Sequence, residues 1–282
     1  MVKKILAILL GLLIIIGICV VNARYINTNQ LYVREEIIYT SKLDENSNDI
    51  LIAYFSDLHY GGLINNSFLD KAINTINNFD PDIIIFGGDL VDDFSTKGIS
   101  VDNREYIINS LKSLESKYGK YAIYGEDDAN EDILNIYNES GFKLLDNTNV
   151  SININNNIIN VVGINSLPEK VGGYLDSFNG INPINYTFVV AHHPDTFKTV
   201  ITNDFDYMLA GHTHGGQVYF PIFSLFNREW GCEEYYKGKT KKNNKTLDIT
   251  NGVGRKDTNA RFLADAEIVM YRLSPTKQQK TN

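Results

Sequence analysis

The chain contains five histidines, and each one follows closely on an apolar run that predicts a buried strand. They are His59, His192, His193, His212 and His214. Two aspartates, Asp57 in SDLH and Asp89 in GGD, have the same kind of position. Because open α/β sheets build their sites at the carboxyl ends of their strands, we expect these side chains to converge. Imidazole nitrogens and carboxylate oxygens together suit Mn²⁺, Fe or Zn²⁺, and this many ligands favours two metal ions over one.

The motifs that contain these residues differ in how specifically they indicate a metal site. SDLH alone fits a capped helix start as well as it fits metal binding. GGD alone is a common turn, and a histidine before proline, as in AHHP, is often only a turn residue. GHTHGG is the stronger signal, because His212 and His214 stand two apart in extended chain and therefore point the same way. Two metal ions held in this manner can clamp a phosphoryl group and generate a hydroxide nucleophile at neutral pH.

The elements that must position these residues alternate between strands and helices. Apolar runs predict buried strands at residues 50–55, 82–86, 121–124, 158–164, 187–191 and 207–210, and residues 31–39 predict a half-buried strand. Helical periodicity predicts three helices. One begins at Ser67, one covers about residues 103–118, and a short one ends near Gly141. This alternation predicts an α/β domain whose sheet is at least partly parallel.

Two polar stretches are predicted to be hairpin loops. The Asn-rich residues 153–157 form one of them, and the basic run KGKTKKNNK at residues 237–245 forms the other. An alternative for the basic run is contact with anionic lipid or substrate.

Residues 5–21 are uncharged and apolar, with Lys3 and Lys4 before them and Arg24 after them. This pattern predicts a signal anchor in a transmembrane helix, with cleavage after Ala23 as the alternative. The paired lysines would stay cytoplasmic, so the rest of the chain would lie outside the cell membrane. We therefore expect an anchor at residues 1–23, one domain at residues 24–274 and a disordered tail at residues 275–282.

Charge and cysteine content exclude some classes of protein. The chain has 26 Lys and Arg against 34 Asp and Glu, a formal net charge of −8, and the first two lysines belong to the anchor. An acidic domain of this kind is wrong for a sequence-independent nucleic-acid binder. Cys19 lies in the apolar run and Cys232 is alone in the domain, so no disulfide framework is possible there.

SDLH, GGD, a Gly-x-x-Asp at the end of a predicted strand, HHP and GHTHGG occur in the order that resembles the calcineurin-like metallophosphoesterase superfamily. The resemblance is to its membrane-anchored or exported bacterial branch and covers about residues 31–273. It implies a four-layer α/β/β/α sandwich with two divalent metal ions, Mn, Fe or Zn, at one edge. In the residues of this chain, Asp57, His59 and His214 would hold one metal, Asp89 would bridge both, and His192 and His212 would hold the second. His193 is not expected to be a ligand.

The stretch Gly125-Glu126-Asp127-Asp128 departs from the Gly-Asn-His-Asp or Gly-Asn-His-Glu pattern of that family. Glu126 replaces the asparagine that ligates the second metal, and we expect it to be a ligand. The alternatives are a single-metal site with Glu126 free, or a site without metal. With three carboxylates, two divalent cations would leave a net charge of about +1 rather than +2, which weakens the attraction for phosphate.

Asp127 replaces the histidine that would stabilise the transition state or protonate the leaving group, and it is the candidate catalytic residue at that position. With an ordinary pKa of about 3.9, it would be ionised at neutral pH, unable to donate a proton and repulsive to an anionic substrate. Loss of a general acid costs about 10²–10⁴ in rate. The alternative for Asp127 is a carboxylate outside the reaction, and we expect Asp128 to cap the following helix.

The sequence therefore predicts an extracytoplasmic, membrane-anchored hydrolase in which metal-bound hydroxide attacks an envelope phosphomonoester, phosphodiester or pyrophosphate. Its partners would be a phosphorylated small-molecule or lipid substrate and the membrane, with no nucleic acid. The alternative is a catalytically weakened protein that keeps its metals and recognises a phosphorylated lipid or wall polymer.

Overall fold

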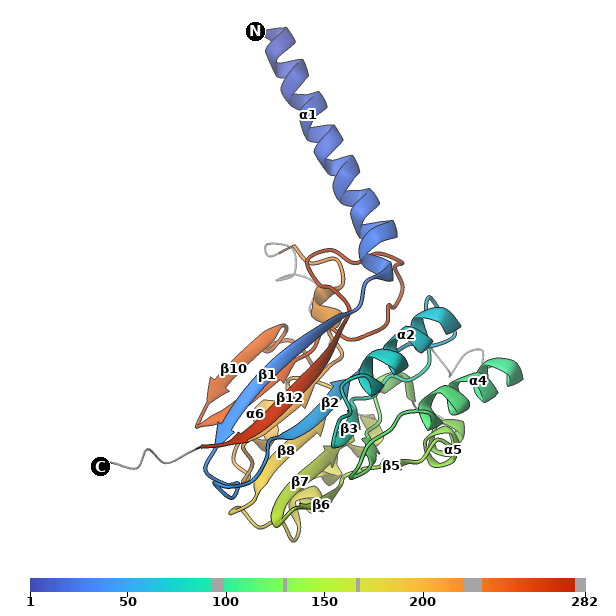
Figure 1. The fold of residues 1–282 in the computed structure, drawn as a ribbon. Coiled ribbons are helices and arrows are strands. Elements are labelled where there is room, and N and C mark those ends of the chain that lie inside the picture. Colours follow the sequence, from blue (N-terminus) through green and yellow to red (C-terminus); the bar gives the residue numbers. More distant parts are fainter. Residues whose placement is uncertain (93–98, 129–130, 166–167, 221–229, 277–282) are drawn as a thin grey trace.

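Two six-stranded sheets lie face to face, with helices on their outer sides (Figure 1). The computed structural model describes residues 1–92, 99–128, 131–165, 168–220 and 230–276. The first sheet has the order β1 (Tyr32–Thr40), β12 (Glu267–Pro275), β2 (Ile50–Phe55), β3 (Ile83–Phe86), β4 (Lys120–Ala122), β5 (Phe142–Leu144). The second has the order β10 (Gly238–Lys242), β11 (Lys245–Ile249), β9 (Tyr207–Ala210), β8 (Tyr186–Ala191), β7 (Asn157–Ile164), β6 (Thr148–Ile154).

The alternation of side chains along each central strand produces the four layers. On β2, Ala53 and Phe55 pack towards the helices, whereas Ile52 and Tyr54 point into the space between the sheets. On β8, Phe188 points into that same space and its neighbours pack against the outer helices of the second sheet. Because both faces of both sheets are covered, these strands read as continuous apolar runs. The predicted α/β/β/α sandwich is confirmed.

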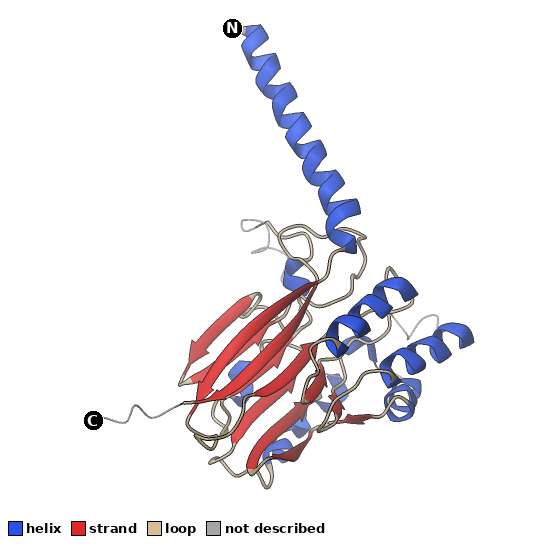
Figure 2. Ribbon diagram, in the orientation of Figure 1, coloured by secondary structure: helices blue, strands red, loops and turns tan. Residues whose placement is uncertain are grey.

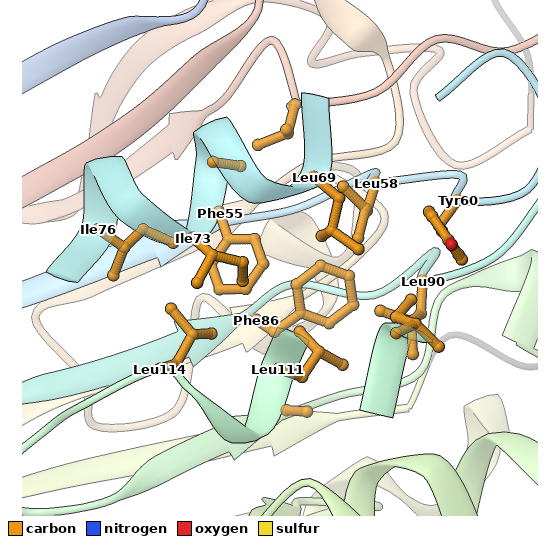
Figure 3. Packing of buried hydrophobic residues seen from close by; sticks show 14 of the residues in the cluster. Phe55, Leu58, Tyr60, Leu69, Ile73, Ile76, Phe86, Leu90, Leu111 and Leu114 are labelled. Carbon is orange, nitrogen blue, oxygen red and sulfur yellow. The ribbon is translucent and has the colours of Figure 1, made fainter. Parts of the chain in front are cut away.

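The helices over the first sheet begin at the residues that their sequence signals indicate. The side chain of Asn65 accepts a hydrogen bond from the backbone N–H of Phe68 and caps α2 (Asn66–Asn77). The apolar face of α2 packs with Phe55, Phe86 and the neighbouring α4 (Figure 3). α4 (Val101–Lys112) ends earlier than the predicted helix over residues 103–118. One reason is that Lys120 donates to the carbonyl of Leu111 and satisfies the end of the helix.

The remaining helices are shorter, and Figure 2 shows where helices and strands lie in the fold. α5 (Glu131–Glu139) follows β4. Over the second sheet lie η4 (Pro168–Phe178) and α6 (Thr196–Val200). Both predicted hairpins are present, but most of the basic run at residues 237–245 lies in β10 and not in the loop. Asn155 and Asn156 join β6 to β7, and Asn243 and Asn244 join β10 to β11, all four with positive φ.

Strand direction determines which end of the domain meets the N-terminal segment. β2, β3 and β4 run parallel, so their carboxyl ends share one edge of the first sheet. β12 runs antiparallel to β2, and β1 runs parallel to β12. The start of β1 therefore lies at the edge where β2, β3 and β4 end.

The N-terminal helix α1 (Val2–Val21) extends away from this edge and has no buried residue (Figure 1). It continues through η1 (Asn22–Ile26) and η2 (Asn27–Asn29) into the domain. The segment Val2–Asn29 is long and apolar enough to cross a membrane, and an 18-residue window within it has a mean hydropathy of 3.0. At the other end, β12 continues to Pro275, one residue beyond the expected end of the domain. The rest of the predicted tail, residues 277–282, lies outside the described residues.

Candidate metal centre

The strand ends bring all seven predicted metal ligands to one place. Asp57 and His59 follow β2, Asp89 follows β3, Glu126 follows β4, His192 follows β8, and His212 and His214 follow β9. Six of these side chains are buried, and Glu126 is partly buried with 25% of its side chain exposed. The sequence-based expectation that they converge is therefore met by the geometry.

The ligand atoms form two groups with an aspartate between them. Asp57, His59 and His214 each offer an atom within 4.8 Å of the others, and so do Glu126, His192 and His212. Within the first group, the Nε2 atoms of His59 and His214 lie 3.0 Å apart. In the second, Glu126 Oε2 lies 3.1 Å from His192 Nε2. Asp89 Oδ2 reaches both groups, at 3.6 Å from His59 Nε2 and 3.2 Å from His192 Nε2.

The backbone at this site is strained. Five of the seven residues have a left-handed φ between 46° and 70°, a conformation in which a residue other than glycine is uncommon. These five are Asp57, His59, Asp89, His212 and His214. Each such residue costs roughly 1–3 kcal/mol, and such residues gather where function requires them. Glycines allow the tight approach of the loops, since a Cβ on Gly125 would lie 2.1 Å from Asp89 Oδ1.

Backbone carbonyls hold two of the imidazole rings. His192 Nδ1 lies 2.7 Å from the carbonyl oxygen of Gly87, and His212 Nε2 lies 3.0 Å from that of Trp230. When the contacting nitrogen donates to the carbonyl, the other nitrogen of each ring is free of its proton and faces the cluster. This is how proteins fix the tautomer and orientation of a metal-ligating histidine.

The donor atoms fit a pair of divalent cations. Asp57 Oδ2 is buried and makes no hydrogen bond, which would cost about 1–3 kcal/mol without a compensating partner. The two facing Nε2 atoms of His59 and His214 would repel if both were bare or both protonated, whereas both can bind one cation. Nitrogen and carboxylate oxygen donors of this kind suit Mn²⁺, Fe or Zn²⁺.

The charges of the cluster are strongly coupled. Burial raises the pKa of Glu126, but His192 and the hydrogen bonds from three histidines outweigh it and hold that pKa well below its usual range. Burial lowers the pKa of His192, but Asp89, Glu126 and Asp57 outweigh it and raise that pKa well above its usual range. The carboxylates therefore create a potential that favours cations in this space.

Asp127 differs in position from Glu126. Its Oδ2 lies 2.6 Å from the ammonium of Lys256 and 3.5 Å from His59 Nδ1. The Lys256 ammonium also lies 4.0 Å from Glu126 Oε1. The sequence analysis missed Lys256, because no spacing rule connects the segment between β11 and β12 with the end of β4. Asp127 is expected from the sequence to repel an anionic substrate, and the ion pair with Lys256 offsets that negative charge.

The expectation that Asp128 caps the following helix is also wrong. Its side chain is fully buried and accepts hydrogen bonds from the backbone N–H groups of Asp89, Leu90 and Gly125 at 2.8–2.9 Å. Asp128 thereby ties the loop after β3 to the loop after β4. Burial and the nearby Asp89 raise the pKa of Asp128 to about 7.

Two further polar side chains border the cluster. His193 Nε2 lies 3.1 Å from Glu126 Oε2, and its ring stands edge-on to Trp230. His193 therefore contacts the candidate ligand Glu126. Asp92, which the sequence analysis did not single out, lies close enough to His59 and Asp127 to form a third group of possible ligand atoms.

A pocket of about 370 Å³ opens beside the cluster. Its walls include the candidate ligands Asp89, Glu126, His212 and His214 and the loop residues Gln217, Val218, Lys256, Asp257 and Thr258. The pocket thus joins metal-ligand side chains to the segment between β11 and β12.

Comparisons with known proteins agree with this arrangement. The family model for calcineurin-like phosphoesterases matches residues 50–216, more than half of the chain. The metallophosphoesterase YkuE of Bacillus subtilis is 25% identical over 90% of this chain and 89% of its own length. A metallophosphoesterase of Campylobacter jejuni is 30% identical over 81% of this chain and 60% of its own length.

A more distant relative is the transmembrane protein with metallophosphoesterase domain of Danio rerio, 25% identical over 67% of this chain and 45% of its own length. The family match covers the strand ends that bear every candidate ligand, from Asp57 to His214. The chain therefore belongs to the calcineurin-like phosphoesterase family.

Proposed function

We propose that this protein is a membrane-anchored phosphoesterase that uses two divalent metal ions to hydrolyse a phosphorylated molecule of the cell envelope. The observation that carries the proposal is the convergence of seven metal-ligand side chains into two groups that share Asp89. Membership of the family supports phosphoester hydrolysis as the reaction class.

Asp57, His59, His214 and Asp89 would hold one cation, and Glu126, His192, His212 and Asp89 would hold the other. Two cations in such a site polarise the phosphoryl group and make water nucleophilic at neutral pH. The protein would hold the two groups of candidate ligands at a fixed distance from each other. It would also keep bulk water away from the buried ligands and present the phosphoryl group to the open pocket.

Lys256 is the positive group that the chain itself adds to this pocket. Its ammonium lies beside Asp127, where the family has a histidine, and a cation there can hold a phosphoryl oxygen by charge-assisted hydrogen bonding. Asp127 would then position Lys256 instead of donating a proton. This arrangement stabilises charge, but its ammonium is a weaker acid than an imidazolium because, although burial lowers the pKa of Lys256, the hydrogen bond to Asp127 raises it, so substrates with good leaving groups should react faster than alkyl esters.

Several contacts support an anchor that stays attached. The backbone N–H of Arg261 donates to the carbonyl of Ala23 at 2.9 Å, and Ala23 is buried. The helical path runs from Val2 to Asn29 without an extended stretch at Ala23, where a protease would need one. The paired lysines before the apolar helix favour a domain on the outer side of the membrane.

The direct test is hydrolysis of bis-p-nitrophenyl phosphate and p-nitrophenyl phosphate by the purified full chain in detergent with Mn²⁺. We expect turnover well above that of the Asp89→Ala variant, because the latter lacks the residue that reaches both groups. Equal rates in the two proteins, for both compounds, would refute the proposal.

A second candidate is a protein that binds metals and a phosphorylated ligand without turnover. Asp127 favours it, since this carboxylate is paired with Lys256 and does not supply the imidazole that the family pattern has at this position. The Glu126→Asn/Asp127→His double variant separates the two candidates in the same assay. Activity that appears only in the double variant would support binding without turnover, and activity in the natural chain would support the enzyme.

A further inference from the structure

We propose that the pocket faces the bilayer that α1 crosses and that the substrates are phosphorylated lipids whose head groups enter it at the membrane surface. This inference rests on the phosphoesterase function proposed above. It identifies the class of substrate from the position of the site relative to the anchor.

The first argument is the direction of the strands. The candidate ligands follow the carboxyl ends of β2, β3 and β4, and the start of β1 lies at that same edge. Tyr32, the first residue of β1, pairs with Glu267, and two residues further along β12 Val269 pairs with Tyr54 near the end of β2. The chain therefore leaves the anchor beside the site and not at the opposite end of the sandwich.

The second argument is a continuous set of hydrogen bonds from the anchor to the wall of the pocket. Arg24 donates to the carbonyl of Asn259, and Arg255 donates to that of Thr28. Asn27 donates to the carbonyl of Arg261 at 3.1 Å. The base of α1 is thus bonded to residues 255–261, the loop that passes beside it in Figure 1.

The same loop forms part of the pocket. Gln217 donates to the carbonyls of Lys256 and Thr258 at 2.9 and 2.7 Å, and all three residues line the pocket. Only a few hydrogen bonds therefore separate the pocket from the first residues after the membrane span. The loop holds the opening of the pocket at the height of the bilayer surface.

The third argument is the apolar character of the surface around this loop. Large apolar side chains are exposed on the segment after α1, on the loop between β11 and β12 that is bonded to it, and on the loop after β9 that is bonded in turn to that loop: Tyr25, Ile26, Leu263, Val218 and Phe220. We call these five residues the apolar rim. Val218 forms an isolated β-bridge with Phe262, and the Phe220 ring packs on the Phe262 ring. The two loops therefore form one continuous surface. Apolar side chains grouped next to a membrane span are suited to the boundary between head groups and acyl chains.

Leu263 is the most informative member of the apolar rim. It is 59% exposed, and its φ of 53° is left-handed, which is costly for a leucine. The Lys237 ammonium bonds its carbonyl at 2.7 Å and holds the backbone in this shape. A strained backbone that turns an apolar side chain outward indicates that the side chain has a partner, and the adjacent bilayer supplies one.

For a lipid phosphomonoester, water would add to phosphorus and the bond from phosphorus to the lipid oxygen would break. The products are inorganic phosphate and a lipid alcohol, with the proton of water passing to the leaving oxygen. A phosphorylated lipid keeps its acyl chains in the bilayer throughout, so the reaction requires a site that opens at the membrane surface.

The position of the pocket can be tested without catalysis. The full chain is reconstituted in phosphatidylcholine vesicles as Leu263→Trp in a Trp230→Phe background, which leaves one tryptophan. We expect lipids brominated near the head-group end of their acyl chains to quench this tryptophan. The matched control is Ile184→Trp in the same background, because Ile184 is 74% exposed and precedes β8, at the edge opposite to the site. Quenching at neither residue, or at both equally, would overturn the proposal.

The substrate class is tested in the same vesicles with phosphatidic acid in the bilayer and p-nitrophenyl phosphate in solution. We expect Leu263→Asp to lower hydrolysis of phosphatidic acid about tenfold and to leave hydrolysis of p-nitrophenyl phosphate unchanged, whereas Ile184→Asp changes neither. Hydrolysis of p-nitrophenyl phosphate but not of phosphatidic acid or of a lipid diphosphate would overturn the substrate class alone. Absence of hydrolysis with every compound would refute the phosphoesterase function, and the quenching result would still decide the orientation.

Discussion

At the scale of single residues, the pair of Asp127 and Lys256 is the main departure of this site from the family pattern. A family histidine is replaced by a carboxylate, and a lysine from another loop lies 2.6 Å from it. The net charge at this position is therefore close to that of a neutral histidine. What the pair lacks is a proton donor as acidic as an imidazolium.

Replacing Lys256 tests its role at the phosphoryl group. We expect Lys256→Met to lower kcat/KM for p-nitrophenyl phosphate about 10- to 100-fold, because it removes a charge-assisted hydrogen bond and leaves Asp127 unopposed. Inhibition by inorganic phosphate should weaken in parallel, and Lys256→Arg should restore part of both. Lys241→Met, at an exposed lysine on β10, is the control. If phosphate inhibition is unchanged in Lys256→Met, the lysine does not contact the phosphoryl group.

Replacement of Glu126 is expected to change the affinity for Mn²⁺ and the affinity for phosphate in opposite directions. We expect Glu126→Asn to weaken Mn²⁺ binding about tenfold or more in calorimetry, since the second group loses an anionic ligand. With metal saturated, the same change should tighten inhibition by phosphate roughly tenfold, because the site gains one unit of positive charge. Tighter binding of Mn²⁺ would show that Glu126 is not a ligand.

The sequence predicted the convergence of the candidate ligands better than their surroundings. The seven candidate positions converge because they follow strand ends, which is a property of chain order alone. Lys256 and Asp92 could not be found in this way. Each approaches the cluster through a loop, and the path of a loop depends on contacts between distant segments.

At the scale of elements, the loop between β11 and β12 is held by one buried arginine. The Arg261 guanidinium is fully buried and donates to the carbonyls of Asn251, Gly252, Gly254 and Ala264. Burial lowers the pKa of Arg261 to about 10, so the side chain remains charged at neutral pH. The loop packs tightly against Asp57, since a Cβ on Gly252 would lie 2.7 Å from Asp57 Cβ.

We expect Arg261→Met to lower the free energy of unfolding by about 3 kcal/mol, because it leaves several buried carbonyls without a donor. Urea unfolding of the full chain in detergent, followed by circular dichroism, measures the change. Arg272→Met is the control, since Arg272 is partly exposed and forms only a loose ion pair with Asp49. Equal stability of the two variants would contradict this role for Arg261.

The prediction of helices and strands was accurate where the sequence pattern is unambiguous. The strands and α2 were found because their apolar runs and spacing have one interpretation. The end of α4 was misjudged, because Lys120 satisfies its terminal carbonyls from outside the helix. The predicted cap at Asp128 failed because that carboxylate accepts N–H groups from two loops that the sequence does not show to be neighbours.

At the scale of the whole molecule, a buried ion network joins the two sheets. Arg34 on β1 donates to both carboxylate oxygens of Asp248 on β11, at 2.9 and 3.1 Å, and also contacts Glu267 on β12. The hydroxyls of Tyr207 and Tyr271 bond the same aspartate. Asp248 is almost fully buried, so its charge depends on these partners.

We expect Arg34→Met to destabilise the protein by about 3–5 kcal/mol, because it leaves a buried carboxylate without its cation. The double variant Arg34→Met/Asp248→Asn should recover part of that loss. Arg104→Met, at an exposed ion pair with Glu139, should change little. Thermal unfolding of the four proteins provides the comparison, and a double variant no more stable than Arg34→Met would argue against this account.

The hydrogen bonds between residues 22–29 and the loop at residues 255–261 hold the domain in a fixed position relative to the end of α1. With a flexible linker of n residues, the site would vary in its distance from the end of the membrane span by about 5–6 Å × √n. With the fixed connection found here, the candidate ligands would stay at one height above the membrane, and only phosphates held at that height would reach them. The protein would search for substrate by lateral diffusion in two dimensions, and its rate would follow the mole fraction of substrate in the membrane, not its concentration in bulk water.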